Sequence, residues 1–416
     1  MRAHVRADML LAIMQANLTT LFLVALIAVA APLVSELPIR LRLPIVVLEI
    51  ALGIVVGPHV LNWAEPTGVL AFLGTLGLGF LFFLAGLELD FDELRGSPLQ
   101  LGVKSWIVSI IVALAVTIAL RTTGFVSAPI MVATALATTA IGTLLPILRD
   151  SGELKTRFGK LVLGAGAVGE LGPVLVVSVV LTREHTTWVQ TLLLLAFAGV
   201  ALAAAMAASK VRLRPIVRLL ERTLHASSQL PVRICILLMI GLVLLANEFG
   251  LDLILGAFAA GMVVRLASEG EKGEVLREKL EAIGYGFLVP LFFVTSGIKF
   301  NLASLLESTN AMARVPLYVG LFLLVRGAPS LLFYRKDLKK GEHLPFILYI
   351  STALPLVVAI TDIGVATGRM RSENAAALVG AGMVSVLVFP LLALVLRRRS
   401  GAVQTGQGRG DEEDAL

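Results

Sequence analysis

One acidic residue stands in the middle of an uncharged, glycine-rich stretch, GAGAVGELGPVLVV, which covers residues 164–177. Glu170 lies about 12 residues into an apolar run of about 25, which places it near the centre of a helix long enough to cross a bilayer. An ionised carboxylate at that depth is costly unless it faces water or a cation. We therefore expect Glu170 to bind a proton and a cation in alternation. The alternative is a neutral, hydrogen-bonded structural acid.

A second ionisable residue, Arg326, lies about 13 residues into another apolar run and cannot easily extend to the membrane surface. A buried guanidinium near Glu170 would favour the ionised form of the carboxylate. The alternative is that Arg326 pairs with helix carbonyls in a structural role. These two residues are the strongest candidates for chemistry in the chain.

The composition requires both residues to be positioned by membrane helices. Of the 416 residues, 57% are hydrophobic and only 15% are charged, which is outside the range of soluble domains. Open strands cannot satisfy their backbone in lipid, and the apolar runs lack the alternation of a membrane β-barrel, so we expect an all-α membrane protein. The sequence predicts about 13 transmembrane helices. They lie near 17–37, 43–61, 66–89, 98–120, 127–148, 158–182, 187–209, 231–249, 251–268, 283–300, 313–334, 344–368 and 373–396.

Several classes of function are disfavoured by what the sequence lacks. The single cysteine, Cys235, argues against a disulfide framework, and the five histidines show no metal-binding spacing. There is no Walker motif or dinucleotide fingerprint, which argues against an ATP-driven pump. The net charge of +6 comes from loop residues and does not indicate a nucleic-acid partner. We expect neither an enzyme nor a cofactor, and no metal centre.

The basic residues predict how the chain is oriented. Most of the 35 Lys and Arg residues fall in alternate loops, on the side of the membrane expected to be cytoplasmic. This pattern predicts a multi-pass protein of the inner (plasma) membrane, with the N-terminus outside and the C-terminus in the cytoplasm. We expect a short external N-terminus at 1–16, a transmembrane domain at 17–399 and a disordered cytoplasmic tail at 400–416, which is Gly-rich and ends acidic.

Three pairs of segments suggest an internal repeat. GFLFFLAGLELDF resembles FLVPLFFVTSGIKFNL, LGIVVGPHV resembles LGAFAAGMVV, and TALATTAIG resembles TALPLVVAI, in the same order and seven spans apart. An odd offset inverts the second copy, so we expect two inverted five-helix repeats at about 43–182 and 251–396. The runs at 127–148 and 344–368 contain Thr, Gly and Pro near their centres, including Pro355. They are predicted to be broken helices that cross at mid-membrane, although these residues are also common in continuous membrane helices.

At this point the sequence resembles the monovalent cation:proton antiporter-2 family, over nearly the whole membrane part. The resemblance rests on LPIVVLEIALGIVVGPHVL, LGFLFFLAGLELDFDELR, the segment from LATTAIG to GAGAVGELGPVLVV, EFGLDLILGAFAAGMVV and LVPLFFVTSGIKFNL. It implies a secondary transporter that works as a homodimer in a lipid bilayer. It also implies that Glu170 is the transport carboxylate and that Arg326 occupies the position of a Lys or Arg paired with it.

The resemblance suggests roles for other polar residues. Thr138 and Thr139 match a small hydroxylated motif in the broken helix and would add neutral ligands, although ordinary packing hydroxyls explain them equally well. Glu49 matches a common acidic position and is expected to be a structural partner for the second repeat. Asp362 would collect cations in an outer funnel, unless it is simply a solvated helix end.

The sequence departs from the family pattern at two positions. Where electrogenic members have two aspartates, this chain has Gly169 followed by Glu170, and ALPLVV replaces a segment that often carries a Gly-Glu pair. With one deep carboxylate, we expect electroneutral exchange of Na⁺ or K⁺ for H⁺ by alternating access. A passive channel would need a ring of acids, which the sequence lacks. The main alternative is a symporter of an organic anion on a related inverted-repeat fold, with Arg326 binding the substrate carboxylate.

Overall fold

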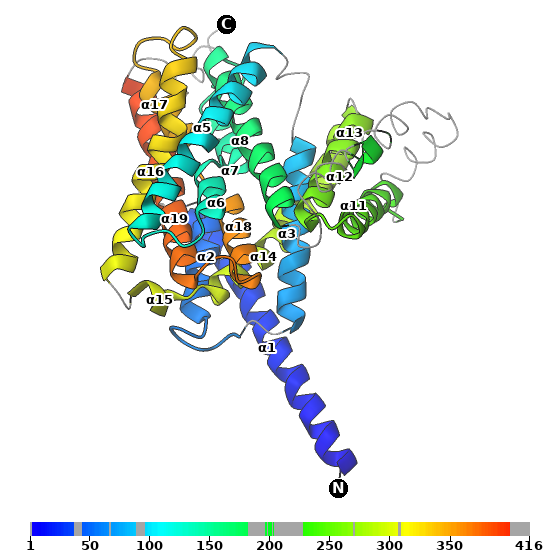
Figure 1. Ribbon diagram of the computed structural model, residues 1–416. Coiled ribbons are helices and arrows are strands. Elements are labelled where there is room, and N and C mark those ends of the chain that lie inside the picture. The colour runs from blue at the N-terminus through cyan, green and yellow to red at the C-terminus, as the bar shows by residue number, and fades with distance from the viewer. Residues whose placement is uncertain are drawn as a thin grey trace, which may run out of the picture. The chain divides into compact units, whose positions relative to one another are not determined.

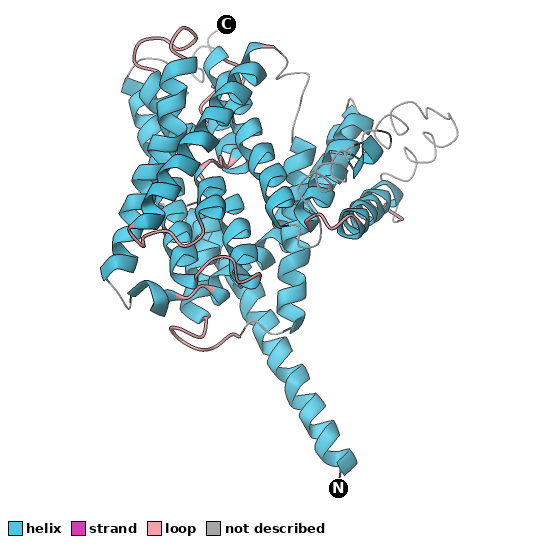
Figure 2. Ribbon diagram, viewed as in Figure 1, coloured by secondary structure: helices cyan, strands magenta, loops and turns pink. Residues whose placement is uncertain are grey.

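The computed structural model describes residues 2–36, 44–65, 68–88, 96–181, 196–197, 199–201, 203, 228–268, 271–306 and 309–399. Every regular element in these ranges is a helix, which confirms the all-α prediction (Figure 2). Nine of the described helices are long and apolar enough to cross a membrane, and three shorter apolar helices accompany them. The predicted tail at 400–416 and most of the predicted run at 187–209 lie outside the described residues.

The chain forms two compact units that alternate along the sequence. Unit 1 comprises Met1–Phe91 and Val174–Thr309, and unit 2 comprises Asp92–Pro173 and Asn310–Leu416. The helices that lie in unit 1 are α1 (Arg2–Glu36), α2 (Ile45–Val56), α3 (Gly68–Glu88), α11 (Leu230–Glu248), α12 (Leu253–Ala267), α13 (Glu271–Ile283), a π-helical turn (Gly284–Leu288), α14 (Val289–Lys299) and α15 (Leu302–Leu306). Those of unit 2 are α5 (Ser97–Thr122), α6 (Pro129–Leu136), α7 (Ile141–Asp150), most of α8 (Arg157–Leu181), α16 (Thr309–Phe333), α17 (His343–Ile350), α18 (Pro355–Ala366) and α19 (Ser372–Arg399).

Glycine contacts in unit 1 support the predicted repeat. A Cβ placed on Gly86 in α3 would lie 2.2 Å from the Phe258 carbonyl oxygen in α12, and one on Gly297 in α14 would lie 2.3 Å from the Ile50 carbonyl oxygen in α2. Gly86 lies in the first copy of the GFLFFLAGLELDF-type motif and Gly297 in the second. Each therefore allows its helix to approach the first helix of the other copy, backbone against backbone.

Unit 2 contains two helices that are interrupted near their centres. α6 and α7 are separated by residues 137–140, and α17 and α18 by residues 351–354. The two interrupted helices run in opposite directions. At one end of unit 2, Asn374, at the start of α19, donates a hydrogen bond to Ser127, just before α6. At the other end, Arg397 pairs with Glu153, just after α7. Helix α5 packs against α6, and α19 packs against α17 and α18 (Figure 1).

Candidate functional site

The two interruptions in unit 2, residues 137–140 and 351–354, meet and hydrogen-bond to each other. We call the place where they meet the crossing. The Ala140 N–H, at the start of α7, donates to the Thr352 carbonyl oxygen at 2.8 Å. The Thr139 hydroxyl donates to the carbonyl oxygen of Ile350, the last residue of α17, at 2.5 Å. The Thr139 N–H also donates to the Gly169 carbonyl oxygen at 3.0 Å, and this bond brings α8 to the crossing. The predicted broken helices therefore exist and meet beside the residue that precedes Glu170.

Specific side chains satisfy the exposed backbone at each interruption. The indole N–H of Trp106 in α5 donates to the Ala137 carbonyl oxygen at 3.1 Å. In the second interruption, the Ala353 N–H donates to the Ser385 hydroxyl of α19 at 3.0 Å. Pro355 opens α18 and has no N–H, which suits the first position of a helix. Irregular backbone at membrane depth persists only where protein or water satisfies it, so Trp106 and Ser385 make the breaks possible.

Arg326 of α16 is 1% exposed and lies at the crossing. Its Nε–H donates to the Thr139 hydroxyl at 3.1 Å and to the Ile350 carbonyl oxygen at 3.3 Å, and its Nη2 donates to the Ala165 carbonyl oxygen at 3.0 Å. One guanidinium therefore joins the first interruption, the second interruption and α8. Two of these bonds go to helix carbonyls, as in the structural alternative for Arg326, and the third goes to the Thr139 hydroxyl.

Two polar groups at the crossing remain unsatisfied. Among the described residues, neither Arg326 Nη1 nor the Ser351 hydroxyl has a hydrogen-bond partner, and both are buried. Unpartnered polar groups cost free energy in an apolar interior, and such groups in native proteins usually mark a site for water, an ion or a mechanistic step. The crossing is therefore a polar site with unused hydrogen-bonding capacity.

The glycines around Glu170 allow close packing against α8. Glu170 itself is buried in α8, at 9% exposure. A Cβ on Gly169 would lie 2.7 Å from the Thr139 hydroxyl oxygen and 2.8 Å from Arg326 Nη2. A Cβ on Gly172 would lie 2.5 Å from the Trp106 ring. Protein atoms rather than solvent fill these positions, and a second carboxylate at position 169 would displace Arg326 or Thr139.

The interrupted helices bring four helix ends together. The N-termini of α7 and α18 carry partial positive charge, and the C-termini of α6 and α17 carry partial negative charge. Arg326 bonds to the C-terminal carbonyl of α17, where a cation is favourable. Two positive helix ends, two negative helix ends and one guanidinium thus lie at the crossing.

The other predicted residues occupy different positions. The Thr138 hydroxyl donates to the Ala135 carbonyl oxygen within the last turn of α6, so it satisfies the helix end. Asp362 is half-buried in α18, two turns beyond Pro355. Glu49 is 3% exposed in α2 and belongs to unit 1, whereas the crossing belongs to unit 2. The structure thus brings together Thr139, Gly169 and Arg326, next to Glu170.

Sequence reasoning missed Trp106 and Ser385. Both lie within predicted membrane runs, and a Trp well inside such a run carries an N–H that lipid cannot satisfy. That unmet donor was the signal for Trp106. Ser385 gave a weaker signal, because serine is common in membrane helices and often bonds to its own helix.

Crossed, interrupted helices next to a buried carboxylate define the class of ion-coupled secondary transporters. Residues 20–394 match the family described as "Sodium/hydrogen exchanger, transmembrane". The chain belongs to this family, which confirms the resemblance to monovalent cation:proton antiporters seen in the sequence.

Named relatives and a solved structure agree with this assignment. The chain is 26% identical over 404 residues to the putative Na(+)/H(+) antiporter YjbQ of Bacillus subtilis (strain 168), covering 92% of this chain and 64% of that protein. It is 29% identical over 289 residues to the Na(+)/H(+)-K(+) antiporter GerN of Bacillus cereus, covering 67% and 71%. Its fold matches the sodium proton antiporter MjNhaP1 of Methanocaldococcus jannaschii with a TM-score of 0.66 and 15% identity, over 93% of this chain and 98% of that one.

The role of Thr139 in holding the crossing can be tested by exchanging its hydroxyl for a methyl group. Thr139→Val leaves Arg326 Nε with only the longer bond to Ile350, so we expect a loss of about 2 kcal/mol and a melting temperature several degrees lower. Thr139→Ser should melt close to the wild type. Thermal unfolding in detergent measures both.

The matched control is Thr361→Val. Thr361 is also buried, but its hydroxyl bonds only to the Val358 carbonyl within α18, so its removal should change the melting temperature little. If Thr139→Val and Thr361→Val melted alike, Thr139 would have no special part in joining the two interruptions.

Proposed function

We propose that the chain is a secondary active antiporter that exchanges Na⁺ or K⁺ for H⁺ by alternating access. The observation that carries the proposal is the position of Glu170, a buried carboxylate one residue from the point where α8 meets the crossed helices. The family match supports the same class of transport. The names of the relatives, which mention sodium, potassium and protons, agree with it.

Glu170 would hold either a proton or a cation in each half of the cycle. An ionised carboxylate without a counter-ion is unstable deep in the membrane. The site therefore changes its access from one side of the membrane to the other only when Glu170 is neutralised by a proton or by a cation. Arg326 Nη2 lies against Gly169 and would keep an electropositive surface beside Glu170. Thr139, Pro355 and Gly169 would act indirectly, by shaping the crossing, and Thr138 by completing the end of α6.

Further features of the protein follow from the same proposal. The transmembrane antiporter domain would span 17–399, with repeats at about 43–182 and 251–396, preceded by the external residues 1–16 and followed by the cytoplasmic tail 400–416. The loop charges support a plasma-membrane protein with its C-terminus in the cytoplasm. We also propose a homodimer, with Asp362 in the outer funnel and Glu49 as a structural acid of the membrane domain.

The organic-anion symporter is less well supported. It would need Arg326 to receive a substrate carboxylate, but the Nε and Nη2 groups of Arg326 already bond to protein oxygens. The family assignment also points to cations rather than organic anions. Proteoliposomes assayed for organic-anion uptake and for cation-driven collapse of a pH gradient would separate the two functions.

Replacing the carboxylate of Glu170 tests the proposed function. Glu170→Gln keeps the size of the side chain but can neither release a proton nor neutralise a cation. It should therefore insert normally and lose cation-driven proton movement, measured with a pH dye inside proteoliposomes. Glu248→Gln, at the exposed end of α11, is the control and should exchange as the wild type does. Retained exchange in Glu170→Gln would rule out Glu170 as the transport site.

The single carboxylate also predicts the stoichiometry of exchange. One site that holds either one H⁺ or one monovalent cation moves equal charge in each direction, so transport should be electroneutral. Arg326 does not alter this, because an arginine stays protonated in the working pH range. With the membrane potential clamped by valinomycin and K⁺, an imposed potential of about 100 mV, which is about 2.3 kcal/mol per charge moved, should leave Na⁺-driven exchange unchanged. A rate that rose with potential would reveal a second titrating group.

A further inference from the structure

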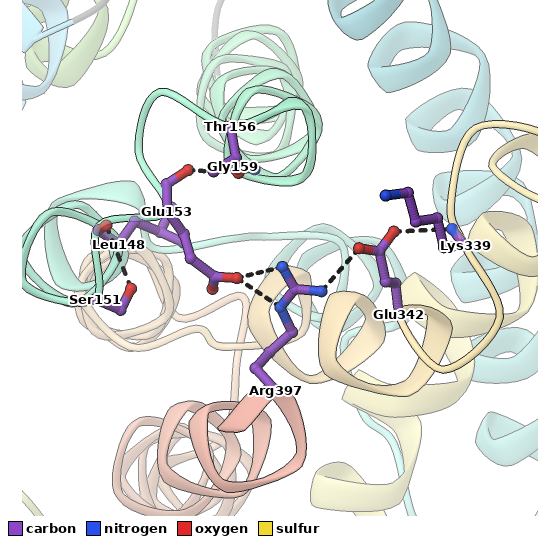
Figure 3. A network of polar contacts seen from close by, with 8 residues as sticks. All are labelled: Leu148, Ser151, Glu153, Thr156, Gly159, Lys339, Glu342 and Arg397. Carbon is purple, nitrogen blue, oxygen red and sulfur yellow. Dashed lines mark hydrogen bonds and ion pairs between the residues drawn. The ribbon is translucent and has the colours of Figure 1, made fainter. Parts of the chain in front are cut away.

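A second buried arginine, Arg397, connects α7 and α17 at the ends that lie away from the crossing. We call α7 and α17 the two half-helices, and these ends their outer ends. It lies in the last turn of α19 and is 3% exposed. Its Nε–H donates to Glu153 Oε1 at 2.6 Å, and its Nη2 also pairs with that oxygen. Its Nη1 donates to Glu342 Oε1 at 2.8 Å. Figure 3 shows the guanidinium between the two carboxylates.

The two glutamates sit directly at the ends of the half-helices. Glu153 follows the last turn of α7, and its N–H donates to the Leu148 carbonyl oxygen at 2.9 Å. Glu342 immediately precedes α17, where an acidic side chain is favourable. Arg397 therefore connects the end of α7 to the start of α17, through two carboxylates whose backbones are fixed to those helices.

The surroundings hold the Arg397 guanidinium in one position. The Phe158 ring lies 4.0 Å from its central carbon, and Phe158 in turn packs edge-on against Phe346 and Tyr349 of α17. Burial acts to raise the pKa of Glu342, but hydrogen bonds from the Lys339 N–H and from Arg397 outweigh it, so this pKa lies below its ordinary value. Glu342 is therefore ionised at neutral pH and remains a partner for Arg397.

The two half-helices are thus tied at both ends. Their inner ends, at Ala140 and Ile350, belong to the crossing that Arg326 holds. Their outer ends are joined by Arg397. α7 and α17 are only 10 and 8 residues long, so the two ties are roughly 15 Å apart. A shift in the contacts of Arg397 would therefore be transmitted to the crossing through α7 and α17, which are short helices.

Stability alone does not account for this network. Burying one cation with two carboxylates is costly, and buried ion pairs can often be replaced by apolar residues without loss of stability. Among the described residues, Glu153 Oε2 has no hydrogen-bond partner, so even this network leaves one oxygen unsatisfied. What the network supplies is a fixed geometry between α7 and α17.

We propose that Arg397 is a positioning residue for cation exchange: by joining Glu153 to Glu342, it sets the relative position of the two half-helices that form the crossing beside Glu170. The proposal rests on the proposed antiport function. Arg397 acts on the cation only through α7 and α17, so its loss should weaken cation binding at the crossing while leaving the protein folded.

The test is the double variant Glu153→Gln/Arg397→Met, which removes the ion pair without leaving Arg397 or Glu153 as an unpaired buried charge. We expect normal insertion and a melting temperature close to that of the wild type, with a rise of about tenfold in the apparent KM for the driving cation. The maximal rate should change much less than KM. If the double variant does not fold, Arg397→Lys replaces it, since a lysine cannot bridge two carboxylates as a planar guanidinium does.

The matched control is Glu373→Gln/Arg314→Met, which removes an ion pair of 2.9 Å near the opposite end of α19. This pair joins α19 to α16 and does not connect α7 to α17, so KM should stay within about twofold of the wild-type value. A wild-type KM in the Arg397 variant, or an equal rise in KM in both doubles, would overturn the positioning role. If the wild-type protein itself showed no cation-driven proton movement, the antiport proposal would fail instead.

Discussion

The arrangement of unit 2 depends on how a buried guanidinium is solvated by protein. Arginine at the centre of a membrane helix costs about 3 kcal/mol on insertion scales, and each hydrogen bond to a charged group contributes about 2 kcal/mol. Arg326 makes three such bonds, to Thr139, Ile350 and Ala165. The interrupted helices provide two of these oxygens, those of Thr139 and Ile350, and a continuous helix would have used the Ile350 carbonyl in its own backbone. The break and the arginine therefore stabilise each other.

This constraint also accounts for the glycine at position 169. The space that a side chain would need there is taken by Thr139 and by Arg326 itself. The packing at position 169 thus leaves Glu170 as the carboxylate next to the crossing. The proposed electroneutral exchange rests on this packing. In the proposed role of Arg397 the same principle applies, because a buried cation fixes the distance between the two short helices α7 and α17.

Much of the fold could be predicted from the sequence, because it depends on composition and periodicity. The apolar runs gave the helices, and Thr, Gly and Pro near the centres of two runs gave the interruptions. The partners of Arg326 could not be predicted, since Ala165 and Ile350 contribute only carbonyl groups that every residue carries. The Arg397 network escaped sequence reasoning for a different reason: Glu153, Glu342 and Arg397 each lie at a helix end, where charged residues are expected to be solvated. Only the structure shows that Glu153 and Arg397 are buried together.

The central claim is that one carboxylate binds either a proton or a cation, and the most direct test counts the protons released when a cation binds. Purified protein in weakly buffered detergent solution would be titrated with the cation that drives exchange, at a pH where Glu170 is protonated, while an indicator dye reports released protons. We expect about one proton per cation bound in the wild type and none in Glu170→Gln. Cation binding without proton release in the wild type, or equal release in Glu170→Gln, would contradict the account.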